Sequence, residues 1–149
     1  MNPVIVLDSG PLSLLANPNR TGLTIPCRAW LQALLANNRR VIVPEIADYE
    51  VRRELIRASK SMSLVKLNVL SARLEYLPLT TTAMRLAADI WALARQTGQP
   101  TAGDNTIDGD VILAAQTLSL GISDIVVATS NIGHLSRFVP AEMWQRIPA

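Results

Sequence analysis

The chain has 149 residues, enough for one domain, and its hydrophobic content of 49% is enough to bury a core. A formal charge of +2 is too weak by itself to indicate a nucleic-acid-binding protein, and no apolar stretch has the length that a membrane helix requires. Cys27 is the only cysteine, so an internal disulfide is excluded, and we expect a single domain over residues 1–149, without a secretory signal, in the reducing cytoplasm.

The first half of the chain alternates short apolar runs with helical patterns. Residues 4–7 are apolar and β-branched, and they predict a buried strand that ends at Asp8. Residues 41–43 predict a second buried strand, and Pro44 is expected in the first turn of the helix that follows. That helix combines an apolar stripe with two glutamates that lie four residues apart at its margin.

The second half of the chain repeats this alternation. We expect a helix at 64–74, a small strand at 76–79, a long helix capped by Thr80–Thr82, a helix that begins at Asp108 or Asp110, a strand at 125–128, and a docking segment or short strand at 144–148. Trp91 is expected to face the core from the long helix. Strands that alternate with helices predict an α/β fold, a three-layer α/β/α sandwich with a mostly parallel central sheet.

Oxygen-bearing side chains fall at the strand ends and helix starts of this predicted fold. Ligands collect at the carboxyl ends of strands in open α/β sheets. Mg²⁺ and Mn²⁺ prefer oxygen ligands, and carboxylates that converge repel one another unless a cation or a proton offsets their charge. The pattern therefore predicts a site for a divalent cation. Its candidate members are Asp8, Glu50, Glu54, Asp104, Asp108, Asp110 and Asn131.

Each acid also has a purely structural interpretation. Asp108 is favoured as a helix N-cap, and Asp110 in a first turn is favoured by the helix dipole. Asp8 begins Asp-Ser-Gly-Pro, which is a strong turn sequence. Glu50 and Glu54 can pair with arginines of the same helix, and their spacing does not distinguish which of them faces the site.

Four segments carry these residues in order along the chain: VIVLDSGPLSLL, PEIADYEVRREL, DGDVILAAQTLSLG and VVATSNIGHLSRF. This ordered set resembles the PIN-domain ribonucleases, and among them the VapC-type toxins. The resemblance implies catalytic roles for Asp8, Glu50, Asp110 and Asn131, and Asp108 is expected to join the metal site through a water. It further implies Mg²⁺- or Mn²⁺-dependent cleavage of RNA by a homodimer that pairs with a small antitoxin protein.

Two other functions fit parts of the sequence. The first is a phosphatase that uses Asp8 as a nucleophile, in the manner of haloacid-dehalogenase-like enzymes. That family places a second Asp two residues later, where this chain has Gly10. The second is a PIN-like module that binds RNA or protein with weakened catalysis, and its argument is Asn131, which occupies a position where many relatives have a carboxylate.

Overall fold

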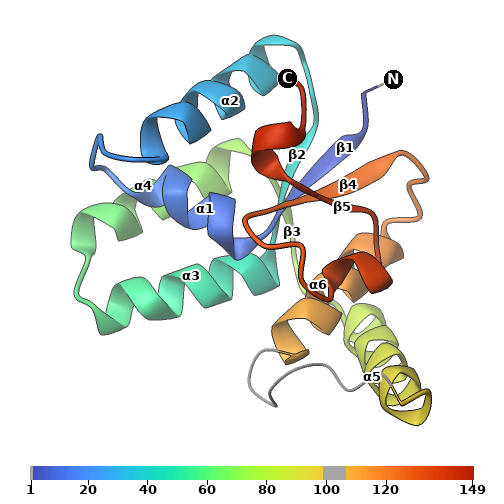
Figure 1. Cartoon of the computed structure of the whole chain (residues 1–149). Helices are drawn as coiled ribbons and strands as arrows, with labels where there is room; N and C mark the ends of the chain where they lie inside the picture. Colours follow the sequence, from blue (N-terminus) through green and yellow to red (C-terminus); the bar gives the residue numbers. More distant parts are fainter. Residues whose placement is uncertain (1, 99–106) are drawn as a thin grey trace.

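A computed structural model describes residues 2–98 and 107–149 of the chain (Figure 1). Its centre is a five-stranded sheet of β1 (Val4–Leu7), β2 (Val41–Pro44), β3 (Glu75–Leu77), β4 (Ile125–Thr129) and β5 (Ala141–Met143). The strands are ordered β3-β2-β1-β4-β5, and every neighbouring pair is parallel. The predicted sheet is confirmed, and all of its described pairings are parallel.

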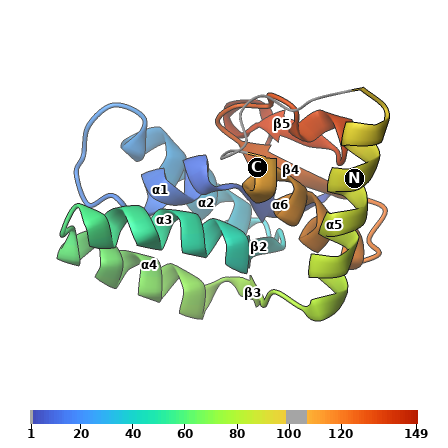
Figure 2. The same cartoon turned by 90° about the horizontal axis from the view of Figure 1, so that it is seen from below.

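Helices cover both faces of this sheet, which confirms the predicted three-layer α/β/α sandwich (Figures 1 and 2). One face carries α1 (Ser9–Ala16), α2 (Thr24–Ala36), α3 (Glu45–Arg57) and α4 (Ser61–Arg73). The other face carries α5 (Thr81–Gln96) and α6 (Ile107–Ser119), with the short 3-10 helix η1 (Leu135–Arg137). No helix in the described ranges is long and apolar enough to cross a membrane.

The central strand β1 shows why helices must pack on both faces of the sheet. All four of its residues are buried, and successive side chains of a strand point to opposite faces. Ile5 and Leu7 pack into the core under α1 to α4, whereas Val4 and Val6 pack into the core under α6. This arrangement is typical of a parallel sheet that is buried on both sides, and it places the carboxyl end of β1 in the middle of the molecule.

The end of the chain docks on α2, as expected for 144–148, through the 3-10 helix η2 (Trp144–Arg146). Trp144 is buried, and its ring centroid lies 5.7 Å from that of Trp30. The indole N–H of Trp30 donates to the Ile147 carbonyl at 2.9 Å. The buried Arg39 donates to the carbonyls of Pro148 and Pro3, so one guanidinium holds both ends of the chain together.

The expectations for Pro44 and Trp91 are wrong. Pro44 is the last residue of β2, where it pairs with Leu77, and it takes the extended N-cap position before α3 instead of the first turn. Trp91 is 38% exposed and does not reach the core. The buried residues of α5 are alanines, which allow α5 to pack closely on α6, and the Trp91 ring lies outside under the Arg95 guanidinium at 4.4 Å.

Candidate active site

Asp8 lies directly after β1, at the point where the strand order of the sheet changes direction. The chain continues from β1 toward β2 and β3 on one side, whereas β4 and β5 lie on the other side. Open α/β sheets bind ligands in the crevice at such a switch point, outside the carboxyl ends of the strands. The Asp8 N–H donates to the Ala128 carbonyl at 2.9 Å, which fixes its backbone to β4.

Both carboxylate oxygens of Asp8 accept hydrogen bonds. Oδ1 accepts from the Ser9 N–H at 2.7 Å, so Asp8 is the N-cap of α1. Oδ2 lies 2.8 Å from the Thr129 hydroxyl at the end of β4. That hydroxyl also lies 3.0 Å from the Asn131 carbonyl, but a carboxylate is the stronger acceptor, so we assign its proton to Asp8. The carboxylate orientation is therefore fixed from two sides.

Glu50 approaches the same crevice from α3. Its carboxylate lies against Gly109 of α6, where a Cβ added to the glycine would come within 2.7 Å of the Glu50 Oε2. Burial, then the charge of Asp8 and, to a smaller extent, that of Asp110 raise the pKa of Glu50 to about 7, against the lowering effect of Arg53. The Glu50 carboxyl therefore holds its proton more readily than a free glutamate does.

Asp110 enters the crevice from the first turn of α6. Burial and then the charge of Asp8 raise its pKa to about 6, whereas His134 lowers it. The shared influence of Asp8 on Glu50 and Asp110 shows that three carboxylates from β1, α3 and α6 gather at one place.

The structure gives the other predicted members different surroundings where it describes them. Because α6 begins at Ile107, Asp108 is inside the first turn and not at the cap. Two residues along a helix differ by about 200° in direction, and Asp108 accordingly lines a pocket of about 350 Å³ between α5 and α6. Glu54 is exposed and paired with Arg57 at 2.8 Å. Asn131 follows β4 with an exposed side chain, and Asp104 lies outside the described residues.

The oxygen donors fit a hard divalent cation in kind, since carboxylate oxygens are its preferred ligands. Nevertheless, no three Asp, Glu, His or Cys side chains in the described ranges are close enough together to form a ready-made metal cluster. The mutual repulsion of carboxylates is a physical reason for them to remain apart. The three acids would therefore have to change rotamer and move closer together to share one ion.

Two glycines shape this crevice, and the sequence analysis missed their role. Gly109 leaves room for Glu50, and a Cβ on Gly10 would come within 2.7 Å of the Ser130 Cβ. The same crowding leaves no space for the second Asp that the phosphatase hypothesis needs at position 10. Both glycines occupy first helical turns, and the sequence carries no separate signal of their packing role.

A groove extends from this site between α1 and α3. It has a volume of about 330 Å³ and begins at Glu50, Ser9 and Gly10. Arg53 and Leu55 line it further along α3, and Ser13 lines it along α1. Glu50 therefore lies at one end of an open channel whose walls include a cation, Arg53, and a second acid, Glu54.

No family model matches this sequence, and a search of curated proteins also finds no match. Solved structures are similar over nearly the whole chain. VapBC2 from Rickettsia felis, bound to a DNA fragment from its promoter, has a TM-score of 0.72 at 17% identity over 95% of this chain and 98% of that chain. DNA-bound VapBC from Salmonella typhimurium has a TM-score of 0.65 at 22% identity over 97% and 99%.

A third similar structure is VapC20 from Mycobacterium tuberculosis, a toxin that cleaves the sarcin-ricin loop, with a TM-score of 0.63 at 14% identity over 91% of this chain and 96% of that chain. At these identities the likeness is one of fold. The molecule therefore has the PIN-domain fold. Its fold is similar to that of these VapBC and VapC structures, in agreement with the sequence resemblance.

Proposed function

We propose that this protein is a metal-dependent endoribonuclease of the cytoplasm that hydrolyses RNA phosphodiesters. The observation that carries the proposal is the position of Asp8. Its carboxylate is fixed by Ser9 and Thr129 at the switch point of the sheet, and its charge raises the pKa values of Glu50 and Asp110. An acidic centre at the end of an open groove suits a reaction in which a cation offsets the charge of a phosphodiester.

Asp8, Asp110 and Glu50 would hold Mg²⁺ or Mn²⁺. Such an ion, when bound, supplies Lewis-acid activation of water and neutralises charge on the phosphodiester. Thr129 orients Asp8, so that its carboxylate keeps one direction. Arg53 lines the groove beside Glu50, where its positive charge favours a phosphate group.

The test compares cleavage of a labelled RNA by the wild type, Asp8→Asn and Asp89→Asn, in Mg²⁺, in Mn²⁺ and in chelator. Asp89 is exposed on α5 and is the matched acid-to-amide control. We expect Asp8→Asn and the chelator to lower the rate by about 100-fold or more, as for loss of a main electrostatic group. An unchanged rate in Asp8→Asn removes Asp8 from the mechanism.

A non-catalytic binding module is the competing function, and it is favoured by the missing ready-made metal cluster in the described ranges. Thermal unfolding with added Mn²⁺ separates the two. A bound ion stabilises the folded chain by mass action, so the proposal requires a rise in Tm that Asp8→Asn abolishes and Asp89→Asn retains. No rise in Tm together with retained RNA binding supports the binding module.

We also propose that the protein is the toxin of a toxin-antitoxin pair and that it forms a homodimer. The similarity to VapBC structures supports the first part. Met62, Val65 and Val69 are 68%, 59% and 42% exposed and lie along one side of α4, a surface that suits an apolar partner segment. Co-purification with a small protein encoded next to this chain, and its loss in Val65→Asp, tests this surface.

The homodimer has its own supporting surface on α5. Met84 and Trp91, seven residues apart on one side of α5, are 44% and 38% exposed, and large exposed apolar residues mark interaction sites. Sedimentation velocity measures the oligomeric state, and Trp91→Glu is expected to shift a dimer to monomer.

A further inference from the structure

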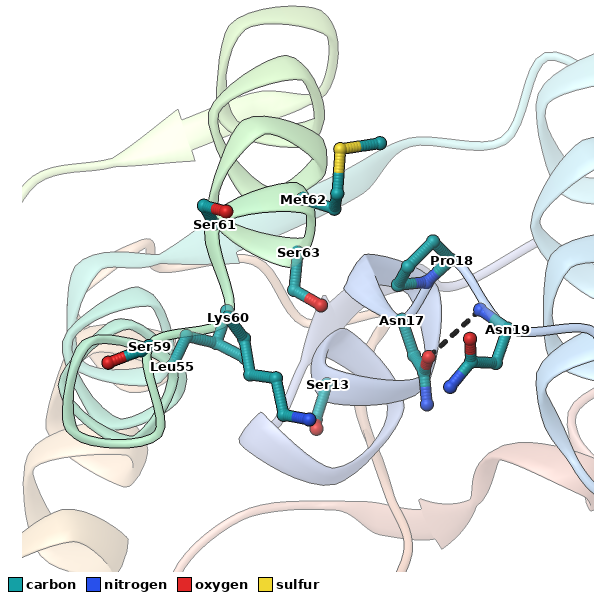
Figure 3. A pocket seen from close by; sticks show the side chains of 10 residues that line it. All are labelled: Ser13, Asn17, Pro18, Asn19, Leu55, Ser59, Lys60, Ser61, Met62 and Ser63. Atoms are coloured by element: carbon teal, nitrogen blue, oxygen red, sulfur yellow. Dashed lines mark hydrogen bonds between the residues drawn. The ribbon is translucent and has the colours of Figure 1, made fainter.

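A polar pocket lies beyond the far end of the groove that leads from the acidic centre (Figure 3). Its volume is about 370 Å³, and it lies between the end of α1 and the turn that joins α3 to α4. It shares Ser13 and Leu55 with the groove, so the two hollows are adjacent. Ser9, Ser13 and Asn17 are spaced four residues apart, and α1 thus presents a polar side along the whole path.

The start of α4 supplies this pocket with backbone donors. The first hydrogen bond of the helix is made by the Leu64 N–H to the Lys60 carbonyl at 3.0 Å. The N–H groups of Ser61, Met62 and Ser63 precede it, and among the described residues they have no acceptor. The N-cap, Lys60, offers no side-chain oxygen, so the positive end of the α4 dipole is left without a cap.

The side chain of Ser63 gives an independent sign of a ligand. Ser63 is only 7% exposed, and its hydroxyl is directed into the pocket (Figure 3). No hydrogen bond of that hydroxyl is made among the described residues. The side chain is enclosed but its oxygen is open to the pocket, so the hydroxyl is available to donate to a bound acceptor.

The remaining walls also present donors. The Asn17 Oδ1 accepts from the Asn19 N–H at 3.0 Å, so the Asn17 amide turns its NH₂ group away from that bond (Figure 3). Arg28 donates to the carbonyls of Asn17 and Asn19, which fixes this wall in place. Lys60 reaches across the pocket toward Ser13 (Figure 3). It is the only charged residue of the pocket lining, as far as the chain is described.

We propose that this pocket binds a backbone phosphate of the RNA substrate, away from the phosphodiester that is cleaved. Unpaired helix N–H groups, a hydroxyl, an amide and an ammonium group without a carboxylate form the donor set that a phosphate accepts. From Ser9 to Asn17 the path along α1 is about 12 Å long at the rise of an α-helix. That length corresponds to a short single-stranded segment between the two sites. The assignment to RNA rests on the proposed function.

The test measures binding of a fluorescein-labelled single-stranded RNA of about twelve nucleotides, a length within the usual site sizes, by anisotropy in chelator. Loss of one phosphate contact lowers the slope of log affinity against log salt by about 0.7 for single strands. We expect this change in Lys60→Gln, with affinity lowered about tenfold. Arg85→Gln, which removes an exposed cation on α5, is the control and retains the wild-type slope.

Ser63→Asp separates binding from folding. The helix dipole stabilises an acid in the first turn of α4, so we expect the Tm of this variant to stay the same or rise. The negative charge repels phosphate, so we expect its RNA affinity to fall about tenfold. Cleavage of the same RNA in Mg²⁺ is the separate readout of the proposed function. If both variants, Lys60→Gln and Ser63→Asp, show the wild-type salt slope while the wild type cleaves RNA, the pocket assignment is wrong and the proposed function stands.

If the wild type does not cleave RNA but the salt slope of its RNA binding still depends on Lys60, the proposed nuclease function is wrong and the pocket assignment stands. A wild type that binds no RNA overturns both. Inorganic phosphate alone is the second probe, observed through the amide resonances of residues 61–63. If phosphate shifts these resonances while Lys60→Gln binds RNA like the wild type, the pocket is a free-anion site and its assignment to RNA is wrong.

Discussion

The Thr129 hydroxyl lies 2.8 Å from the Asp8 carboxylate, across the boundary between β4 and β1. Thr129 is 1% exposed, so its hydroxyl occupies a fixed position at the end of its strand. The same hydroxyl accepts from the Asn131 N–H at 3.1 Å, which ties the turn after β4 to the site. The end of β4 therefore orients the acid at the end of β1.

Thr129→Val tests this positioning role. It keeps the shape of the side chain and removes the hydrogen bond, so we expect cleavage to slow by about tenfold, the equivalent of one such bond to a charged group. The Mn²⁺ concentration that gives half of the maximal rate is expected to increase, since Asp8 loses its fixed orientation. Thr129→Ser should restore both values. A rate in Thr129→Val equal to that of the wild type contradicts the role.

Gly109→Ala is predicted to separate stability from activity. The added Cβ would come within 2.7 Å of the Glu50 Oε2, which is the far end of a flexible side chain and can move. Replacing glycine within a helix stabilises it by about 0.5–1 kcal/mol. We therefore expect unchanged or higher resistance to urea together with slower cleavage. Loss of stability with full activity would show that Glu50 does not need this space.

Stability is predicted to depend on pH through Glu50. Its pKa is higher in the folded chain, about 7, than the ordinary value of 4.5. Ionisation is therefore less favourable in the folded state, and stability is lost as pH rises from about 4.5 to about 7. Glu50→Gln removes this cost, and we expect it to raise the free energy of unfolding at pH 8 by about 1 kcal/mol, allowing for solvent screening.

The measurement is urea denaturation at pH 4 and pH 8, without divalent ions. At pH 4 the variant and the wild type are expected to agree, since the carboxyl is protonated in both states of the wild type. Glu54→Gln is the control on the same helix, because Glu54 is exposed and paired with Arg57, and it should show no gain at pH 8. Equal gains in the two variants would mean that the effect does not come from the crevice.

The buried strands β1, β2 and β4 were predictable because they are short, apolar and β-branched, whereas β5 has the sequence Ala-Glu-Met and was not predicted at its position. The location of Asp8 followed from its place after such a strand. The sequence could not show which of Glu50 and Glu54 faces the site, because both lie on the same side of α3. Only the position of α6 distinguishes them. Pattern alone also misplaced Trp91, since the alanines of α5 take the buried positions.

Gln116 is the buried contact that the sequence does not reveal, and it holds the two helices that carry Glu50 and Asp110. Its side chain is 1% exposed. Its Oε1 accepts from the Ile46 N–H at the start of α3 at 3.1 Å, and its Nε2 donates to the Leu77 carbonyl of β3 at 3.0 Å. Gln116→Leu leaves the buried Ile46 N–H and the part-buried Leu77 carbonyl without this partner, and we expect a loss of about 3 kcal/mol in the free energy of unfolding.

Thr117→Val is the matched control for this variant, because Thr117 is equally buried and its hydroxyl bonds only to the Leu113 carbonyl of its own helix at 2.9 Å. That carbonyl keeps its helical bond, so Thr117→Val should change the free energy of unfolding by less than about 1 kcal/mol. Urea denaturation measures both. Similar losses in the two variants would mean that general packing of α6, and not the two bonds of Gln116, sets the position of Asp110 relative to Glu50.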